Sequence, residues 1–154
     1  MRTFSGSDTE VVTIHASQDR VIAALTDPDQ IKEALSEQLE SGTTIDAHTA
    51  HWVRRSVEEV GVRFRGDYTV QYEHDGHGTI RWHTLGNGNM RTSGEAHVAS
   101  IDETNTRLEY TEAIECDMDV NRFIAPVLKP IVERKIKQGI GTYVAKLKQV
   151  IERS

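Results

Sequence analysis

The chain of 154 residues contains a single cysteine, only three prolines and few aromatic residues, which make up 6% of the sequence. One cysteine, Cys116, excludes an internal disulfide and is typical of a protein in a reducing compartment. No apolar run approaches the roughly 20 residues needed to span a bilayer. The first eight residues also lack the apolar core of a signal peptide. These absences predict a cytoplasmic protein with no integral membrane association.

Basic residues are in the minority, with 18 Lys and Arg against 24 Asp and Glu, which gives a net charge of -6. A nucleic-acid-binding protein needs a basic stripe that displaces counterions from the phosphates, so no nucleic-acid partner is expected. A chain of this length buries roughly 70% of its unfolded surface as one domain. We therefore expect a single domain over residues 1–154, with residues 1–8 as a loose N-terminal segment.

The longest helical pattern in the chain runs from Asp119 to the C-terminus. Asp119 is expected to cap this helix, and Pro126 and Pro130 predict a short separate turn or a kinked entry. Apolar residues recur at three- and four-residue steps and form one broad face. They are Val120, Phe123, Ile124, Val127, Leu128, Ile131, Val132, Ile136, Ile140, Tyr143, Val144, Leu147, Val150 and Ile151. A helix this apolar needs a large concave partner.

The first third of the chain predicts one strand and two short helices. Residues 9–16 alternate and are rich in β-branched side chains, which is typical of a strand. Ser17 is suited to cap a first short helix, and Asp27 followed by Pro28 is suited to begin a second one.

From about Leu39 to Met118 the period of the apolar residues changes to two. Turn signals recur closely enough for consecutive hairpins. They are Gly42, Gly61, Asp75-Gly76, Gly86-Asn87-Gly88 and Asp102-Glu103-Thr104-Asn105. We interpret this region as an antiparallel meander of six strands, which the first strand extends to seven. Each strand has one apolar and one charged face, as in a sheet that is solvated on one side, so the apolar face is expected to meet the C-terminal helix.

Four short segments within this order of elements resemble a known superfamily. They are Leu25-Thr26-Asp27-Pro28, Gly61-Val62-Arg63-Phe64-Arg65-Gly66-Asp67-Tyr68 entering a central strand, Gly94-Glu95-Ala96-His97-Val98, and Thr106-Arg107-Leu108-Glu109-Tyr110. The chain resembles the START-like (SRPBCC) superfamily, and within it the bacterial polyketide cyclases/dehydrases and the G subunits of carbon monoxide dehydrogenase. The resemblance implies an α+β helix-grip fold, in which a seven-stranded curved antiparallel sheet wraps on the long C-terminal helix. It also implies a cavity between sheet and helix that binds a lipid, a polyketide or a similar hydrophobic molecule.

Glu112 is the one carboxylate on the apolar face of the last predicted strand. A hairpin closed at Asp102–Asn105 places Gly94 opposite Glu112, which leaves room for the glutamate side chain to lie across the sheet. A buried carboxylate must be paired, hydrogen-bonded or protonated. It is a candidate general acid/base or an anchor for a polar ligand group. Alternatively, it pairs with Arg54 or Arg55, or a shift in register turns it outward.

The remaining candidate ligand-binding residues are aromatic, small or aliphatic side chains of the apolar face and of the helix. They are Phe64, Tyr68, Tyr72, Trp82, Thr84, Thr92, Gly94, Tyr110, Ile114, Phe123, Ile136 and Tyr143. Aromatic residues with polar groups orient a ligand in a cavity, but in a plain core the same groups bind backbone partners. Phe123 and Tyr143 are expected to close the pocket from the helix side. The pattern does not assign Trp52, Arg54 or Arg55 to a face.

The seven histidines do not predict a metal site. His48 and His51 are three residues apart and therefore point to opposite faces of a strand, and no histidine has the cysteine or carboxylate neighbours that zinc sites show. Neither a metal nor another cofactor is expected.

Three functions follow from these observations. The first is a carrier or sensor that encloses a hydrophobic small molecule. The second is a cofactor-independent cyclase or aromatase in which Glu112 and a tyrosine move protons. The third is an assembly or membrane-recruitment accessory, which the likeness to the G subunits of carbon monoxide dehydrogenase implies.

Overall fold

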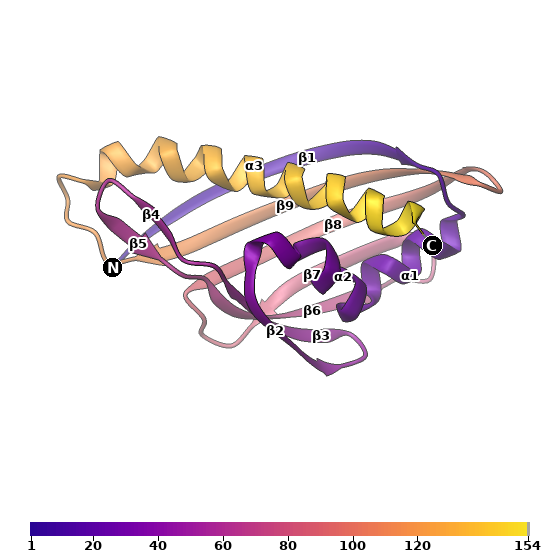
Figure 1. Ribbon diagram of the computed structural model, residues 1–154, viewed down its shortest axis with the longest axis horizontal. Helices are drawn as coiled ribbons and strands as arrows, with labels where there is room; N and C mark the ends of the chain where they lie inside the picture. Colours follow the sequence, from indigo (N-terminus) through magenta and orange to yellow (C-terminus); the bar gives the residue numbers. More distant parts are fainter. Residues whose placement is uncertain (154) are drawn as a thin grey trace.

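The structure is a computed structural model that describes residues 1–153. The elements, in chain order, are β1 (Arg2–Ile14), α1 (Gln18–Thr26), α2 (Pro28–Leu35), the 3-10 helix η1 (Ser36–Gln38), β2 (Leu39–Asp46), β3 (Thr49–Arg54), β4 (Val57–Glu59), β5 (Val62–Phe64), β6 (Asp67–His74), β7 (Thr79–Leu85), β8 (Met90–Asp102), β9 (Asn105–Met118) and α3 (Ala125–Glu152). Seven antiparallel strands form one sheet in the order β1-β9-β8-β7-β6-β3-β2, and β4 pairs only with β5 (Figure 1). The predicted helix-grip fold is confirmed.

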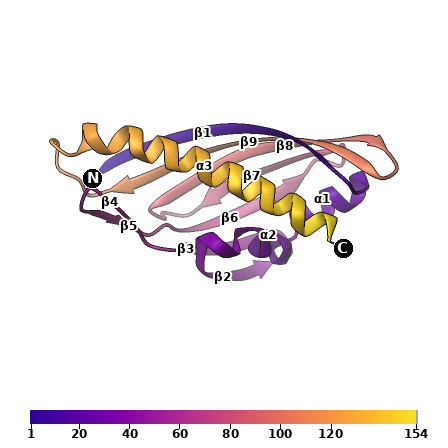
Figure 2. The same ribbon diagram turned by 45° about the horizontal axis from the view of Figure 1, so that its top comes forward.

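Helix α3 crosses the concave side of the sheet and lies closest to β1, with α2 on its other flank (Figures 1 and 2). A glycine in β1 permits this close approach, because a Cβ atom on Gly6 would lie 3.0 Å from Cβ of Ile136. Since the helix follows one edge of the sheet, the central strands β6 to β9 face it across a gap that side chains only partly fill.

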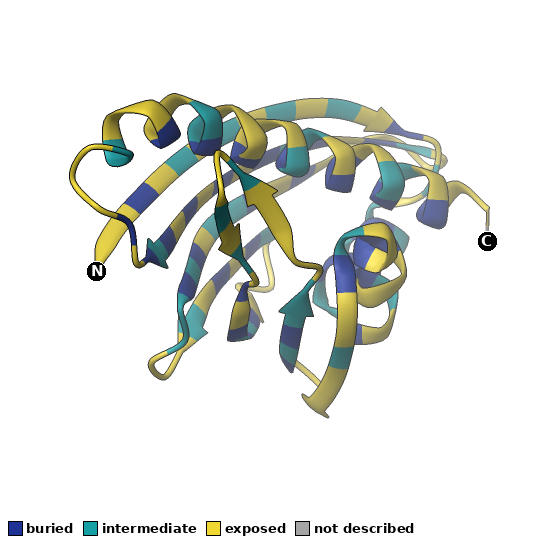
Figure 3. Cartoon of the chain, turned by 60° about the vertical axis from the view of Figure 1, so that its left-hand side comes forward, coloured by how far each residue is buried: buried dark blue, intermediate teal, exposed yellow. Residues whose placement is uncertain are grey.

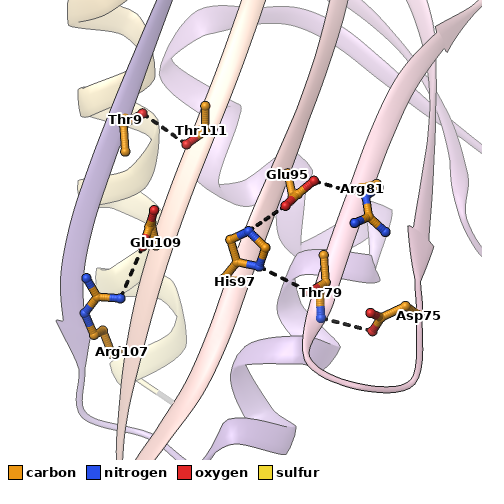
Figure 4. Close-up of polar contacts among 9 residues, drawn as sticks. All are labelled: Thr9, Asp75, Thr79, Arg81, Glu95, His97, Arg107, Glu109 and Thr111. Atoms are coloured by element: carbon orange, nitrogen blue, oxygen red, sulfur yellow. Dashed lines mark hydrogen bonds and ion pairs between the residues drawn. The ribbon is translucent and has the colours of Figure 1, made fainter.

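The two faces of the sheet differ in burial as the alternation predicts. In β9 the residues Leu108, Tyr110, Glu112 and Ile114 are all buried on the inner face, and Figure 3 shows the resulting bands of buried and exposed residues along the strands. The outer face carries a polar ladder, in which Glu95 contacts both Arg81 and His97 (Figure 4). Such exposed ion pairs contribute little to stability, so the inner face holds the sheet on the helices.

The capping residues predicted for the two short helices are confirmed. The Ser17 hydroxyl accepts a hydrogen bond from the backbone N–H of Arg20 at 3.2 Å. The Asp27 carboxylate accepts one from the backbone N–H of Asp29 at 3.0 Å, and Pro28 occupies the first turn of α2.

Residues 1–8 are not a loose segment, so this prediction was wrong. Strand β1 begins at Arg2, which pairs with Met118 at the far end of β9. Phe4 is buried on the inner face. The Ser-Gly-Ser sequence does not have the apolar alternation of a strand. The segment is extended because its backbone pairs with the backbone of β9.

The start of the C-terminal helix also differs from the prediction, which placed the cap at Asp119. Helix α3 begins at Ala125, and the carboxamide oxygen of Asn121 accepts from the backbone N–H groups of Phe123 and Ile124 at 2.9 and 3.0 Å. The expected turn before the helix is confirmed. Pro130 lies inside α3.

The segment after Gly61 does not enter a central strand as expected. Val60 and Gly61 both have positive φ, 45° and 78°, and form the turn of the β4–β5 hairpin, which is separate from the main sheet. The chain then breaks at Gly66, where a Cβ atom would lie only 2.7 Å from Sδ of Met90. The alternating segment therefore spans two strands.

Candidate functional site

A cavity of about 450 Å³ lies between the concave face of the sheet, helix α3 and the β4–β5 hairpin. Most of the predicted ligand-binding residues line it. From that set the wall includes Phe64, Tyr68, Tyr72, Trp82, Thr92, Tyr110, Glu112, Ile114, Ile136 and Tyr143. The expected space between sheet and helix is therefore present, and its wall is mainly aromatic and aliphatic.

Three of the predicted residues do not line the cavity. Phe123 lies in the turn before α3, where its side chain is 74% exposed, because the helix begins later than the apolar pattern. Thr84 lies near the end of β7, beyond the last residue that pairs with β8. Gly94 is covered by the indole of Trp82, since a Cβ atom at this glycine would lie 2.3 Å from Cζ2 of the indole.

One row of residues crosses four strands at the centre of the inner face. Tyr72 pairs with Trp82, Trp82 pairs with Gly94, and Gly94 pairs with Glu112. The predicted position of the glycine opposite the glutamate is confirmed. The Trp82 indole lies over the glycine and stacks on the ring of Tyr110 with a centroid distance of 4.8 Å. The glycine thus makes room for an aromatic ring.

Glu112 is 8% exposed and faces the cavity. Its carboxylate accepts a hydrogen bond from the Thr92 hydroxyl and a second from the Tyr110 hydroxyl at 3.2 Å. Burial raises the pKa of the carboxyl group above its usual value, and the Thr92 hydrogen bond and the charge of Arg54 offset only part of this rise. The alternative of an outward position was wrong, because the Glu112 side chain is buried on the inner face. The alternative of an ion pair with Arg54 or Arg55 was also wrong, because the hydrogen-bond partners of the carboxylate are the hydroxyl groups of Thr92 and Tyr110.

The Trp82 indole N–H has no hydrogen-bond partner, although the residue is only 4% exposed. The N–H lies close enough to the Glu112 carboxylate to lower the pKa of that group through a side-chain interaction, although the contact is longer or less well aligned than a full hydrogen bond. Among residues 1–153 the Thr49 hydroxyl is the other buried side-chain group without a partner.

Trp52 and Arg54, which the sequence did not assign to a face, both point into the cavity. The Trp52 N–H donates to the Tyr72 hydroxyl at 3.1 Å. Arg54 donates from Nε to the Tyr68 hydroxyl at 2.8 Å and from Nη1 to the Gln38 side chain at 2.7 Å. Two residues that are two positions apart share a strand face. An inward indole at Trp52 would therefore have placed Arg54 inward as well.

The charge of Arg54 persists in the cavity. Burial lowers the pKa of its guanidinium, but the interactions with Tyr68 and Glu112 outweigh burial and leave that pKa raised. Burial also raises the pKa values of the Tyr110 and Tyr143 phenols, so both groups are neutral hydrogen-bond donors. It raises the pKa of the Cys116 thiol to about 11, and a thiol in this state is a poor nucleophile.

The cavity opens beside the β4–β5 hairpin. Val57 of the hairpin lines the cavity and is 48% exposed. The hairpin extends from the sheet towards α3 (Figure 3), and Glu59 forms an ion pair with Lys135 of the helix at 2.7 Å. Both of these charged residues belong to the wall. The wall beside the hairpin therefore combines an exposed valine with an ion pair, while the interior is mainly apolar.

The raised pKa of Glu112 predicts a pH-dependent stability. The folded protein binds a proton at Glu112 more tightly than the unfolded chain does. This group therefore lowers the free energy of unfolding as the pH rises above 4.5, the ordinary pKa of a glutamate. Relative to Glu112→Gln, we expect the free energy of unfolding of the wild type to fall by about 1.4 kcal/mol for each unit by which the pKa is raised. Urea unfolding of both proteins between pH 4.5 and 8 measures this loss. A difference that stays constant with pH would contradict it.

Two further features bear on the functional class. Within residues 1–153 no group of three or more His, Cys, Asp and Glu side chains is arranged to hold a metal ion. In the same part of the chain no helix combines the length and the apolar character required to cross a membrane.

Comparison with known proteins places this site in a family context. Residues 6–152 match the family described as polyketide cyclase / dehydrase and lipid transport. No curated protein matches the chain.

Several solved structures share the fold at low sequence identity. The Zhui aromatase/cyclase from Streptomyces sp. R1128 is 14% identical with a TM-score of 0.70, over 97% of this chain and 94% of its own. A protein from Thermus thermophilus, TTHA0849, is 17% identical with a TM-score of 0.70, over 94% and 96%. A START superfamily protein from Mycobacterium smegmatis is 13% identical with a TM-score of 0.67, over 96% and 97%.

Proposed function

Because this chain belongs to the polyketide cyclase/dehydrase and lipid transport family of the START-like superfamily, we propose that it binds a hydrophobic small molecule as a carrier or sensor. The observation that carries the proposal is the cavity of about 450 Å³ with its aromatic and aliphatic wall. A lipid, a polyketide or a molecule of similar character fits such a wall, because burying apolar surface contributes roughly 25 cal/mol per Å².

Titration with a neutral hydrophobic dye such as Nile red tests this function. We expect saturable binding of one dye molecule per chain, with a blue-shifted emission as the dye leaves water. Native mass spectrometry of freshly purified protein should show a bound small molecule that the dye displaces. Protein refolded from denaturant serves as the ligand-free control. If refolded protein in its native fold takes up no dye, the carrier function is wrong.

The second candidate function is that of a cofactor-independent cyclase or aromatase. Glu112 favours it, because a buried carboxylate with a raised pKa is a stronger base than an exposed one. In such an enzyme the Glu112 carboxylate would remove a proton from a carbon next to a carbonyl group, and a tyrosine phenol would donate a hydrogen bond to the resulting enolate oxygen. Turnover of a poly-β-ketone substrate that persists unchanged in Glu112→Gln would eliminate this role. The accessory role remains a prediction from the resemblance.

A further inference from the structure

Arg54 faces the cavity and has no carboxylate partner. In the part of the chain that the structure describes, its guanidinium forms no ion pair, since Nε donates to the Tyr68 hydroxyl and Nη1 to the Gln38 side chain. Glu112 acts on the guanidinium only through its longer-range electrostatic field and forms no hydrogen bond with it. Charges in protein interiors are normally paired, so the charge of Arg54 is left for a ligand.

The Arg54 guanidinium also has unused hydrogen-bond donors. A guanidinium carries five N–H groups, and the contacts with Tyr68 and Gln38 use two of them. The nitrogen Nη2 makes no hydrogen bond to the described residues, yet it is not one of the buried polar atoms that lack a partner, so it keeps accessible surface. Because Arg54 lines the cavity, Nη2 is the donor that a ligand can reach.

The guanidinium is held in position before a ligand arrives. Its Cζ atom lies 5.7 Å from the centroid of the Tyr68 ring. The Gln38 carboxamide accepts from Nη1 of Arg54 and donates to the backbone oxygen of Gly139 on α3 at 3.3 Å. Arg54 is therefore fixed between the sheet and the helix. A group that is already ordered loses little conformational freedom when it binds.

The other charged groups in the wall beside the hairpin do not cancel this positive charge. Glu59 and Lys135 neutralise each other at 2.7 Å. The Glu37 carboxylate is 72% exposed and lies 3.9 Å from a lysine of α3. Arg55 also lines the cavity, and its Nε donates to a backbone oxygen. The wall beside the hairpin therefore has an excess of positive charge, carried by Arg54 and Arg55.

The remaining carboxylate of the wall, Glu112, belongs to another part of the cavity. It lies on β9, and the strands β8, β7 and β6 separate β9 from β3, which carries Arg54. Four spacings of about 4.8 Å place the two backbones roughly 19 Å apart along the sheet. The Glu112 carboxylate is bound by the Thr92 and Tyr110 hydroxyls. An anion at Nη2 of Arg54 would therefore contact the cation and not this carboxylate.

We infer that the ligand of this cavity is a hydrophobic carboxylic acid, whose carboxylate accepts hydrogen bonds from Arg54 and whose apolar part lies against the aromatic wall. The planar N–H groups of a guanidinium match a carboxylate, and such charge-assisted hydrogen bonds are roughly twice as strong as neutral ones. A neutral oxygen would leave the charge of Arg54 unpaired. This inference rests on the proposed binding function and adds the chemical class of the polar end of the ligand.

Matched pairs of an acid and its amide test the charge of this polar end. Decanoate and decanamide have nearly the same shape, as do 2-naphthoate and 2-naphthamide, but only the acids are anions at pH 8. Isothermal titration gives the dissociation constant of each probe. We define the acid preference as the dissociation constant of the amide divided by that of the acid. Comparing this preference between protein variants cancels the different solvation of the probes.

Substitutions of Arg54 should lower the acid preference. Arg54→Met removes the charge and keeps the length of the side chain, and we expect the preference to fall by about tenfold. Arg54→Lys keeps the charge but loses the planar fork, and should lower the preference by about threefold. Arg65→Met is the matched control, because Arg65 pairs with Glu40 at 2.9 Å outside the cavity wall. It changes the net charge equally and should leave the preference as in the wild type.

A measurement on the wild type does not depend on how the variants fold. The carboxyl signal of ¹³C-labelled decanoate reports the pKa of the bound acid. Hydrogen bonds to a carboxylate lower its pKa, whereas burial in an apolar site raises it. We therefore expect the bound acid to titrate at a lower pH than the free acid. A bound acid whose pKa is raised would overturn the inference.

The outcomes distinguish this inference from the function on which it rests. If acids and amides bind and the preference is the same in Arg54→Met as in the wild type, the carboxylate site is wrong and the binding function stands. If the preference falls in Arg55→Met but not in Arg54→Met, the anion binds at the exposed arginine and the inference is overturned. If neither the probes nor Nile red show saturable binding, the binding function fails and the inference fails with it.

Discussion

Replacing Gly94 with leucine is expected to abolish ligand uptake and to lower the free energy of unfolding by about 3 kcal/mol. A Cβ atom at this position would lie 2.3 Å from Cζ2 of Trp82 and 2.4 Å from the backbone oxygen of Thr111. The oxygen belongs to strand β9 and has little freedom to move, so the Trp82 indole must leave its place over the glycine and enter the cavity. Urea unfolding and the Nile red titration measure the two effects.

Two further variants show whether the loss of stability comes from the clash with the Trp82 indole. Ser93→Ala changes the exposed neighbour on the same strand and should shift the unfolding free energy by less than about 0.5 kcal/mol. Trp82→Ala in the Gly94→Leu background should restore part of the lost stability, because it removes one of the two clashes. Additive effects of the two substitutions would show that the leucine does not displace the indole.

Truncation of two leucines on helix α3 is expected to lower the free energy of unfolding by very different amounts. Leu128 and Leu147 are both buried, with exposures of 1% and 0%, but only Leu128 lines the cavity. We expect Leu147→Ala to lower the free energy of unfolding by about 4 kcal/mol, because it opens a void in closely packed surroundings. Leu128→Ala should cost about 2 kcal/mol, because one side of this leucine already faces space and loses fewer contacts.

Ligand binding provides the converse test of the same pair. Leu128→Ala enlarges the cavity and should change the affinity for Nile red, while Leu147→Ala should leave that affinity unchanged at a temperature where both variants are folded. Val127→Ala is the control for the helix itself, since this side chain is 52% exposed. Equal costs at Leu128 and Leu147 would mean that the helix packs equally tightly along its whole length.

The faces of the long strands could be predicted from the sequence because each residue on a strand has only two possible directions. Once Tyr110 and Ile114 were assigned to the apolar side, Glu112 between them had to follow, and the structure confirms its inward position. The register of β8 and β9 followed from the turn at Asp102–Asn105. Period and turn position together define most of the sheet.

The parts that could not be predicted depend on partners distant in sequence. Residues Arg2–Asp8 of β1 pair with β9, which follows more than a hundred residues later in the chain. A Ser-Gly-Ser segment has no local pattern that predicts this pairing. Phe123 fits the helical period, but Asn121 closes a turn before it and leaves it outside the helix. A local pattern cannot show where a tertiary contact ends an element.

The aromatic residues that line the cavity could be predicted from the sequence, but the hydrogen bonds of its polar groups could not. The aromatic residues of the central strands were expected to line the cavity, and Tyr68, Tyr72, Trp82 and Tyr110 do so. Arg54 was not assigned, because its strand is short and mixes polar with apolar residues on both faces. Which donor lacks a partner depends on side-chain geometry, and no sequence pattern records it.

The β4–β5 hairpin has a mechanical consequence. Its ladder hydrogen bonds join only its own two strands, and a two-stranded hairpin has little stability of its own. It is held by the packing of Val62 and Phe64 against the core and by a partly exposed ion pair between Glu59 and Lys135, which contributes little. Because no ladder hydrogen bond joins the hairpin to the seven-stranded sheet, a substitution that weakens this packing is expected to change the rate of ligand entry more than the rate of global unfolding.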